Sequence, residues 1–176
     1  MSLSSIYLQS VLNRLEIHRQ LGLKTIERLN EEQLHWQPEG EPNSIAMIVQ
    51  HLYGNMLSRW TDFLTTDGEK PDRNRDNEFE EQPASQEKIL QQWNSGWDCM
   101  MNAIRSLHES DLDRTVFIRS EPHIVIDAIN RQLAHVPYHV GQIIYIGKMI
   151  LKDQWQSLSI PKGGSAAFNK EKKENK

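Results

Sequence analysis

Apolar side chains recur at three- and four-residue steps over four long stretches of the chain. This spacing is the period of one face of an α-helix, so each stretch predicts an amphipathic helix. Prolines and a glycine interrupt the pattern between the first two stretches, because proline removes a backbone donor. The four predicted helices cover residues 4–29, 45 to about 66, 85–107 and 127–151. They predict an all-α protein built as a four-helix bundle.

Two links between the predicted helices are long and differ in character. Residues 69–84 are polar and predict a loop, and long loops in compact domains are often functional. Residues 115–118 and 123–126 are short β-branched stretches separated by residues 119–122, so they predict a two-stranded hairpin before the last helix. Asp127 is the predicted N-terminal cap of that helix. Links of this length leave the order of the helices in the bundle open.

The composition predicts one folded domain followed by a short polar end. The 176 residues are enough for one sizeable core, and 38% of them are apolar. We expect the bundle to occupy residues 1–165. Residues 166–176 are rich in Lys, Glu and Asn, and they predict a charged flexible tail.

Charge and sequence pattern argue against several classes of protein. The formal net charge of -4 gives no general attraction to phosphate backbones, so we expect no nucleic-acid partner. No apolar stretch is long enough to span a bilayer, and the N-terminus lacks the pattern of a signal peptide. The lone Cys99 has no partner for an internal disulfide, which fits a reducing compartment. We therefore expect a cytoplasmic protein with no membrane partner.

The sharpest local motif is the pair His135 and His139 in the last predicted helix. Histidines four residues apart share a helix face, with Cβ atoms roughly 6 Å apart, so both imidazoles can bind one ion. The alternative is that they are two partly exposed histidines on a helix flank. Their position beside the apolar stripe makes an unpaired imidazole costly, and either a metal or a hydrogen bond removes that cost. Metal sites are common in bundle cores.

His51 in the second predicted helix is the natural third ligand, although it could instead be a core-edge histidine bonded to a neighbour. Three histidines without a nearby cysteine would leave coordination positions open for water or substrate, which is typical of a catalytic site. Zinc and nickel are the leading candidates, and iron also accepts imidazole. Asn55, Tyr138 and Gln142 are candidates to orient ligands or bound water, or they are ordinary polar helix positions.

Five segments stand out together, namely residues 51–55, 59–70, 73–76, 134–142 and 159–165. They resemble the DinB-like superfamily, which includes YfiT-type bacillithiol transferases. More closely, they resemble an uncharacterised bacterial branch of it, and the resemblance covers nearly the whole chain. It implies an up-down-down-up four-helix bundle, often a homodimer, with a divalent metal on His51, His135 and His139.

Three functions compete for such a site. The first, which the resemblance implies, is a metal-dependent transferase that joins a small-molecule thiol to an electrophile. In that case Arg59, Arg73 or Arg75 could hold an anionic part of the thiol, unless they are solvated or paired with Asp76 and Glu78. The second is a metal-dependent hydrolase, although no general base is visible near the ligands in the sequence. The third is a non-enzymatic metal-binding dimer.

Overall fold

A computed structural model describes residues 2–40 and 43–174 of the chain. The described residues are mostly helical, as the apolar pattern predicted, and they include a small two-stranded sheet. The up-down-down-up order stays a prediction. The α-helices are α1 (Leu3–Ile26), α2 (Glu31–Leu34), α3 (Ile45–Trp60), α4 (Gln86–Arg105), α5 (Val125–Leu151) and α6 (Ser165–Glu174).

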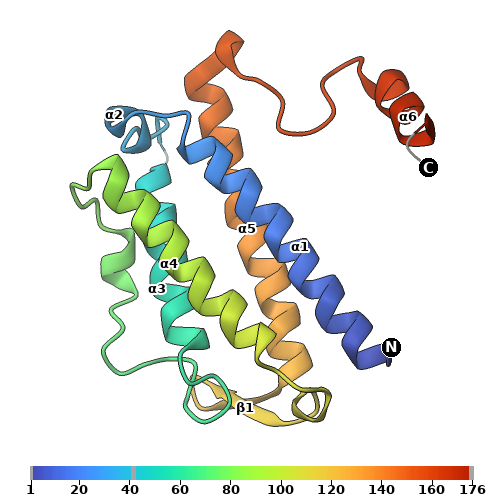
Figure 1. The fold of residues 1–176 in the computed structure, drawn as a ribbon. Coiled ribbons are helices and arrows are strands. Elements are labelled where there is room, and N and C mark those ends of the chain that lie inside the picture. Colours follow the sequence, from blue (N-terminus) through green and yellow to red (C-terminus); the bar gives the residue numbers. More distant parts are fainter. Residues whose placement is uncertain (1, 41–42, 175–176) are drawn as a thin grey trace.

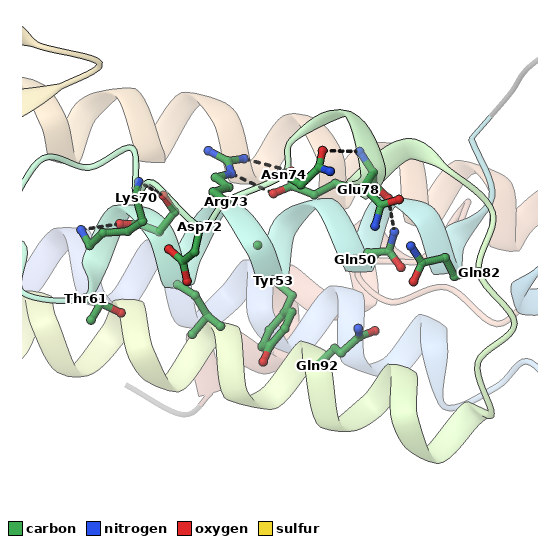
Figure 2. Close-up of a pocket in the computed structure, with 14 residues that line it drawn as sticks. Gln50, Tyr53, Thr61, Lys70, Asp72, Arg73, Asn74, Glu78, Gln82 and Gln92 are labelled. Carbon is green, nitrogen blue, oxygen red and sulfur yellow. Dashed lines mark hydrogen bonds and ion pairs between the residues drawn. The ribbon is translucent and has the colours of Figure 1, made fainter.

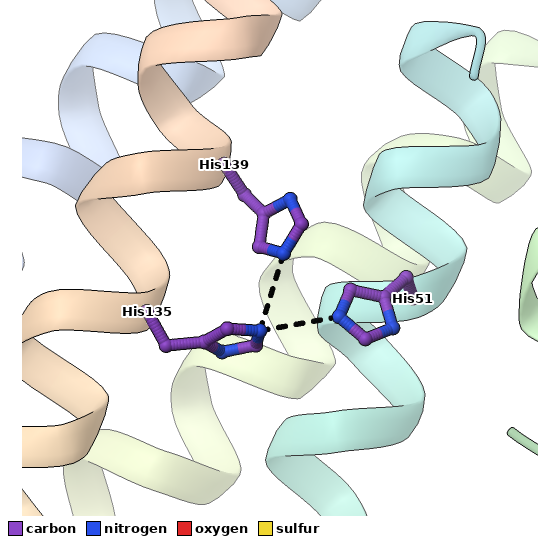
Figure 3. Close-up of side chains that lie close together, drawn as sticks. All are labelled: His51, His135 and His139. Atoms are coloured by element: carbon purple, nitrogen blue, oxygen red, sulfur yellow. Dashed lines mark hydrogen bonds between the residues drawn. The ribbon is translucent and has the colours of Figure 1, made fainter. Parts of the chain in front are cut away.

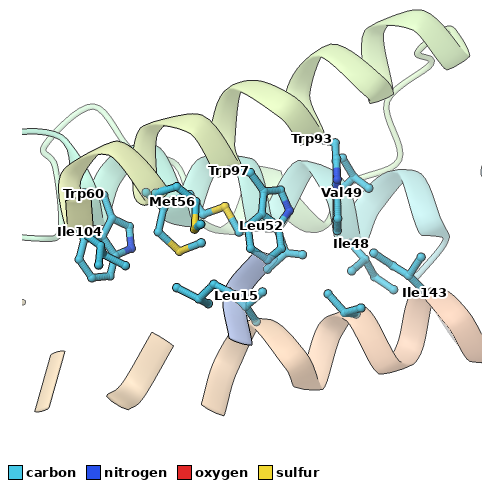
Figure 4. Close-up of a cluster of buried hydrophobic side chains, with 14 of the residues drawn as sticks. Leu15, Ile48, Val49, Leu52, Met56, Trp60, Trp93, Trp97, Ile104 and Ile143 are labelled. Atoms are coloured by element: carbon cyan, nitrogen blue, oxygen red, sulfur yellow. The ribbon is translucent and has the colours of Figure 1, made fainter. Parts of the chain in front are cut away.

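The four long helices α1, α3, α4 and α5 pack side by side (Figure 1). α3 lies against α4 and α5, while α1 contacts α5 and α4. The core between them is filled by large side chains such as Leu15, Leu52, Met56, Trp93 and Trp97, all at most 2% exposed (Figure 4). Close packing of this kind fixes the spacing of neighbouring helices, so α3 and α5 form a rigid support for side chains between them.

The boundaries of α3 show what begins and ends it. Ser44 caps the helix, because its hydroxyl accepts the amide of Met47 at 3.2 Å. The prediction that this helix continues to about residue 66 is wrong. Asp62 has a φ of 49°, and its carbonyl accepts the amides of Thr65 and Thr66 in a turn. Phe63 is buried in this turn. Its spacing from the apolar residues of α3 had predicted a longer helix.

Among the short elements that the apolar pattern did not predict are α2 and a 3₁₀ turn in the loop after α3. Asn30 caps α2, because its side chain accepts the amide of Gln33 while the Gln33 side chain accepts the amide of Asn30. The predicted loop at residues 69–84 contains a 3₁₀ turn, Asp76–Phe79, which packs against α3. This turn brings the middle of a polar loop onto a buried helix.

The predicted hairpin is present, with β1 (Thr115–Ile118) antiparallel to β2 (Glu121–Ile124). The second strand was predicted two residues too late, and α5 begins at Val125, so Asp127 is not its cap. Asp127 lies in the first turn of α5, where its carboxylate accepts a hydrogen bond from His123 Nδ1 at 2.7 Å. This bond joins the hairpin to the start of α5.

The C-terminal segment forms α6 over most of the predicted tail, and none of the residues from 165 to 174 is buried. Its flexibility stays a prediction, and residues 175–176 of that prediction lie outside the described residues. Over the described ranges, none of the helices combines the length and the apolar character needed to cross a bilayer.

Candidate metal centre

Three imidazoles from two helices converge between α3 and α5 (Figure 3). His51 comes from α3, and His135 and His139 come from α5. The Nε2 atom of His135 is 3.2 Å from Nε2 of His51 and 3.1 Å from Nε2 of His139. One ligand atom from each residue lies within 4.8 Å of the other two. The structure therefore brings together the three predicted ligands, of which His51 and His139 are 88 positions apart in the sequence.

The outer nitrogens of two of these rings have polar partners. His51 Nδ1 lies 2.9 Å from a Glu78 oxygen, and His139 Nδ1 lies 2.8 Å from the Gln142 side-chain oxygen. Because both partners accept hydrogen bonds, each Nδ1 donates its proton and the lone pair is on Nε2. A second hydrogen bond of this kind also fixes the orientation of a metal-binding imidazole.

Two of the imidazoles are uncharged at neutral pH. Burial, followed by the proximity of His139 and His51, lowers the pKa of His135 to about 3. Burial and then His51 lower the pKa of His139 to about 4, although the hydrogen bond with Gln142 acts in the opposite direction. Neutral imidazole is the form that coordinates a metal ion.

The geometry of the three nitrogens fits a divalent cation. Ligands about 2.0–2.1 Å from a tetrahedral zinc ion lie about 3.3 Å from one another, close to the two Nε2 separations at His135. His135 Nε2 can donate at most one hydrogen bond, so the lone pairs of His51 and His139 compete for it. A cation among the three nitrogens removes that conflict. The histidines are thus positioned to hold a metal ion, and its identity stays a prediction.

Glu78 is the partner of His51 that the sequence did not reveal. Its side chain is buried and accepts two further hydrogen bonds, from Arg73 Nε at 2.8 Å and Nη2 at 2.9 Å (Figure 2). Burial raises the pKa of Glu78, but the hydrogen bonds from His51 and Arg73 outweigh it and hold that pKa below its usual value. Glu78 is therefore an anion at neutral pH, and the predicted pairing of Arg73 with Glu78 is confirmed.

Gly54 on α3 makes room for this carboxylate. A Cβ atom at Gly54 would lie 2.3 Å from Glu78 Oε1. Glycine inside a helix is less favourable than alanine by about 1 kcal/mol, so it needs a compensating reason. Here the reason is the close approach of Glu78 to the helix surface, one turn from His51.

A cavity of about 640 Å³ opens beside the three histidines. The other site residues predicted from the sequence, Asn55, Arg59, Tyr138 and Gln142, all line it. Asn55 accepts a hydrogen bond from the Gln132 amide at 3.3 Å, and both side chains are buried. Tyr138 is 61% exposed at the edge, with its ring centroid 4.7 Å from that of His139. The roles of these four residues stay predictions.

A second cavity, of about 510 Å³, lies on the other side of Glu78. Figure 2 shows Gln50, Tyr53 and Gln92 along it, between α3 and α4. The three histidines do not line this cavity. Within residues 2–40 and 43–174, no other group of histidine, cysteine or carboxylate side chains has the geometry of a metal site.

Comparison with known proteins identifies a family. The family described as "protein of unknown function (DUF1572)" matches residues 2–164. The chain belongs to this family. No curated protein matches the sequence. The family is one without a described activity, as the resemblance to an uncharacterised branch predicted, and the link to YfiT-type transferases stays a prediction.

Proposed function

We propose that this DUF1572 protein binds one divalent ion through His51, His135 and His139 and uses it to transfer a small thiol to an electrophile. The convergence of three Nε2 atoms at the wall of a cavity that fits a small molecule carries the proposal. Zinc or nickel suits imidazole donors, and iron is also compatible. Such an ion supplies a positive charge that lowers the pKa of a thiol beside it. The DinB-like resemblance, with its up-down-down-up bundle, supports the same chemistry.

The thiol in this proposal comes from the substrate. The sequence has one cysteine, Cys99, and its Sγ lies 3.6 Å from the Thr61 hydroxyl at a different cavity. The described residues that line the cavity of the histidines include no cysteine, aspartate or glutamate. Three protein ligands without a fourth leave coordination positions for water or for a substrate atom.

The arrangement around Glu78 favours thiol transfer over hydrolysis. Attack by a metal-activated water usually needs a nearby general base. Glu78 Oε2 accepts hydrogen bonds from His51 and Arg73, and Oε1 accepts one from Arg73. Both oxygens of this carboxylate therefore already have hydrogen-bond donors. Its role in the proposal is to orient His51.

The test is a conjugation assay with protein loaded with zinc or nickel. A thiol such as bacillithiol, cysteine or coenzyme A is mixed with monochlorobimane. A carbon–sulfur bond forms, chloride leaves with the electrons of its bond to carbon, and one proton is released. We expect a metal-dependent rate that falls at least about 100-fold in His135→Ala. His123→Ala, whose imidazole bonds Asp127 outside the cavity, is the matched control.

Three results separate the candidate functions. The absence of a metal-dependent rate with every cellular thiol contradicts the proposed transferase. Turnover of esters or amides without any thiol favours a hydrolase instead. A stoichiometric metal with no turnover of either kind leaves a non-enzymatic metal-binding protein.

A further inference from the structure

The cavity beside the histidines is strongly cationic. Among the described residues, its lining includes five arginines and no acidic side chain. Two of these arginines have carboxylate partners, since Arg73 bonds Glu78 and Glu69, and Arg119 bonds Glu69. The lining arginines are Arg59, Arg73, Arg75, Arg119 and Arg131. The positive charge of the arginines that line the cavity therefore exceeds the negative charge of their carboxylate partners.

Arg59 is the least compensated of these cations. Its side chain is on α3, the residue is only 9% exposed, and Arg59 Nε is buried without a hydrogen-bond partner. It has no hydrogen bond or ion pair with any residue that the structure describes. Burial, followed by Arg131 and Arg73, lowers its pKa to about 10, so it remains a cation at neutral pH. A buried charge without a partner is costly, which points to a missing anion.

Gly68 provides the space in which Arg59 lies. A Cβ atom at Gly68 would be 2.9 Å from Arg59 Cδ and 3.3 Å from Arg59 Nε. The Gly68 amide donates to the Phe117 carbonyl at 2.8 Å, which fixes this backbone against the hairpin. The chain therefore builds a defined place for the guanidinium at the cavity wall.

Arg59 and Arg131 lie on the same side of the histidines. Arg59 is eight residues after His51 on α3, or about 12 Å along the helix axis. Arg131 is four residues before His135 on α5, or about 6 Å along that axis. The end of α3 and the start of α5 both lie next to the hairpin (Figure 1). The cavity thus has histidines toward its middle and unpaired arginines toward the hairpin.

We propose that Arg59 and Arg131 form an anion subsite for a carboxylate or phosphate group of the substrate, whose reacting end lies at the histidines. The location of the reacting end rests on the proposed function, whereas the anion subsite does not. Guanidinium groups bind both oxyanions through paired N–H donors, so the shared chemistry is a planar or tetrahedral oxyanion. The substrate is accordingly an elongated anionic molecule.

The test is calorimetric titration of the metal-free and the metal-loaded protein with succinate and, separately, with inorganic phosphate. We expect at least one probe to bind in both forms of the protein, and the preferred probe identifies the oxyanion. Arg59→Gln should weaken that binding at least about tenfold. Arg105→Gln is the matched control, because Arg105 is exposed on α4 and bonds only Asn102. It should bind the probe as the unsubstituted protein does.

A second measurement addresses folding of the variants. Without added anion, Arg59→Gln should raise the melting temperature, because the substitution removes an unpaired buried charge. The preferred anion should then raise the melting temperature of the unsubstituted protein more than that of Arg59→Gln. Arg131→Gln, which changes an exposed residue, should also weaken anion binding.

Two outcomes overturn the anion subsite. One is that neither probe binds the unsubstituted protein, and the other is that Arg59→Gln and Arg131→Gln bind as tightly as Arg105→Gln. The metal content of the same samples is read separately. Anion binding without metal binding would contradict the proposed function and leave the anion subsite standing. Metal binding without anion binding would contradict only the anion subsite.

Discussion

His51 and Glu78 form a buried pair, with His51 Nδ1 2.9 Å from Glu78 Oε2 although the two residues are 27 positions apart. Glu78 also binds Arg73, which in turn reaches Glu69 at 3.1 Å. Hydrogen bonds therefore connect the loop between α3 and α4 to the Nδ1 side of His51, a candidate metal ligand. A carboxylate behind a metal-binding imidazole raises its basicity and fixes its orientation, so this loop belongs to the candidate metal site.

Removal of the Glu78 charge should weaken metal binding. In Glu78→Gln the side chain keeps its shape, but it no longer gives His51 an anionic partner, and Arg73 is left less compensated. We expect the zinc affinity to fall by about 10- to 100-fold, measured by competition with a chelator. Glu80→Gln is the control, because Glu80 is exposed and its carboxylate has no partner among the described residues. Equal affinities of the two variants would contradict this role.

The same site can be disturbed from α3 through Gly54. Gly54→Ala should favour the helix by about 1 kcal/mol, but its Cβ would displace Glu78 Oε1, which lies 2.3 Å away. We expect weaker metal binding with little change in helix content by circular dichroism. Gly141→Ala on α5 has no atom within 4 Å of its added Cβ, so it should stabilise the fold by about 1 kcal/mol and leave the metal affinity unchanged. Unchanged affinity in both variants would argue against the Gly54–Glu78 contact.

Asp67 should make the hairpin sensitive to acid. Its carboxylate accepts the amides of Arg119 at 2.8 Å and of Ser120 and Glu69 at 2.7 Å. Burial raises the pKa of Asp67, but these backbone hydrogen bonds outweigh it and hold the pKa below 3.8. The pKa of Asp67 is lower in the folded protein than in the unfolded chain. The stabilisation is therefore complete above the pKa of the unfolded chain and is lost as the pH falls through the pKa of the folded protein.

The corresponding experiment compares Asp67→Asn with the unsubstituted protein between pH 2.5 and pH 7. We expect Asp67→Asn to melt about 2–4 °C lower at pH 7, which corresponds to about 1 kcal/mol after allowance for solvent screening. The difference should shrink below pH 3.8. Asp113→Asn, at an exposed position, serves as the control. A difference that stays constant down to pH 2.5 would contradict the assignment.

The histidine cluster could be predicted in part because His135 and His139 follow a local rule of helix geometry. His51 needed the further assumption that its helix lies beside α5, which apolar patterns favour without fixing the partner helix. The contact of Glu78 with His51 could not be predicted from the sequence, since the position of Glu78 depends on how a polar loop folds over α3. The one local signal was Gly54, because a glycine within a helix often marks a close neighbour.

The ends of elements were harder to predict than their existence. Phe63 continues the apolar spacing of α3, yet it is buried by the turn that begins at Asp62. At the start of α5, Asp127 has the character of a cap, but Ile124 occupies that position without a side-chain hydrogen bond. Local sequence specifies helical faces well, whereas tertiary contacts decide where a helix stops.

Metal content of the purified protein tests the central claim most directly. After loading with zinc or nickel and removal of excess ion, elemental analysis should find about one ion per chain. His51→Ala, His135→Ala and His139→Ala should each lose it, while His123→Ala keeps it. A protein that retains no stoichiometric ion under any loading condition, or variants that retain as much as the unsubstituted chain, would contradict the account.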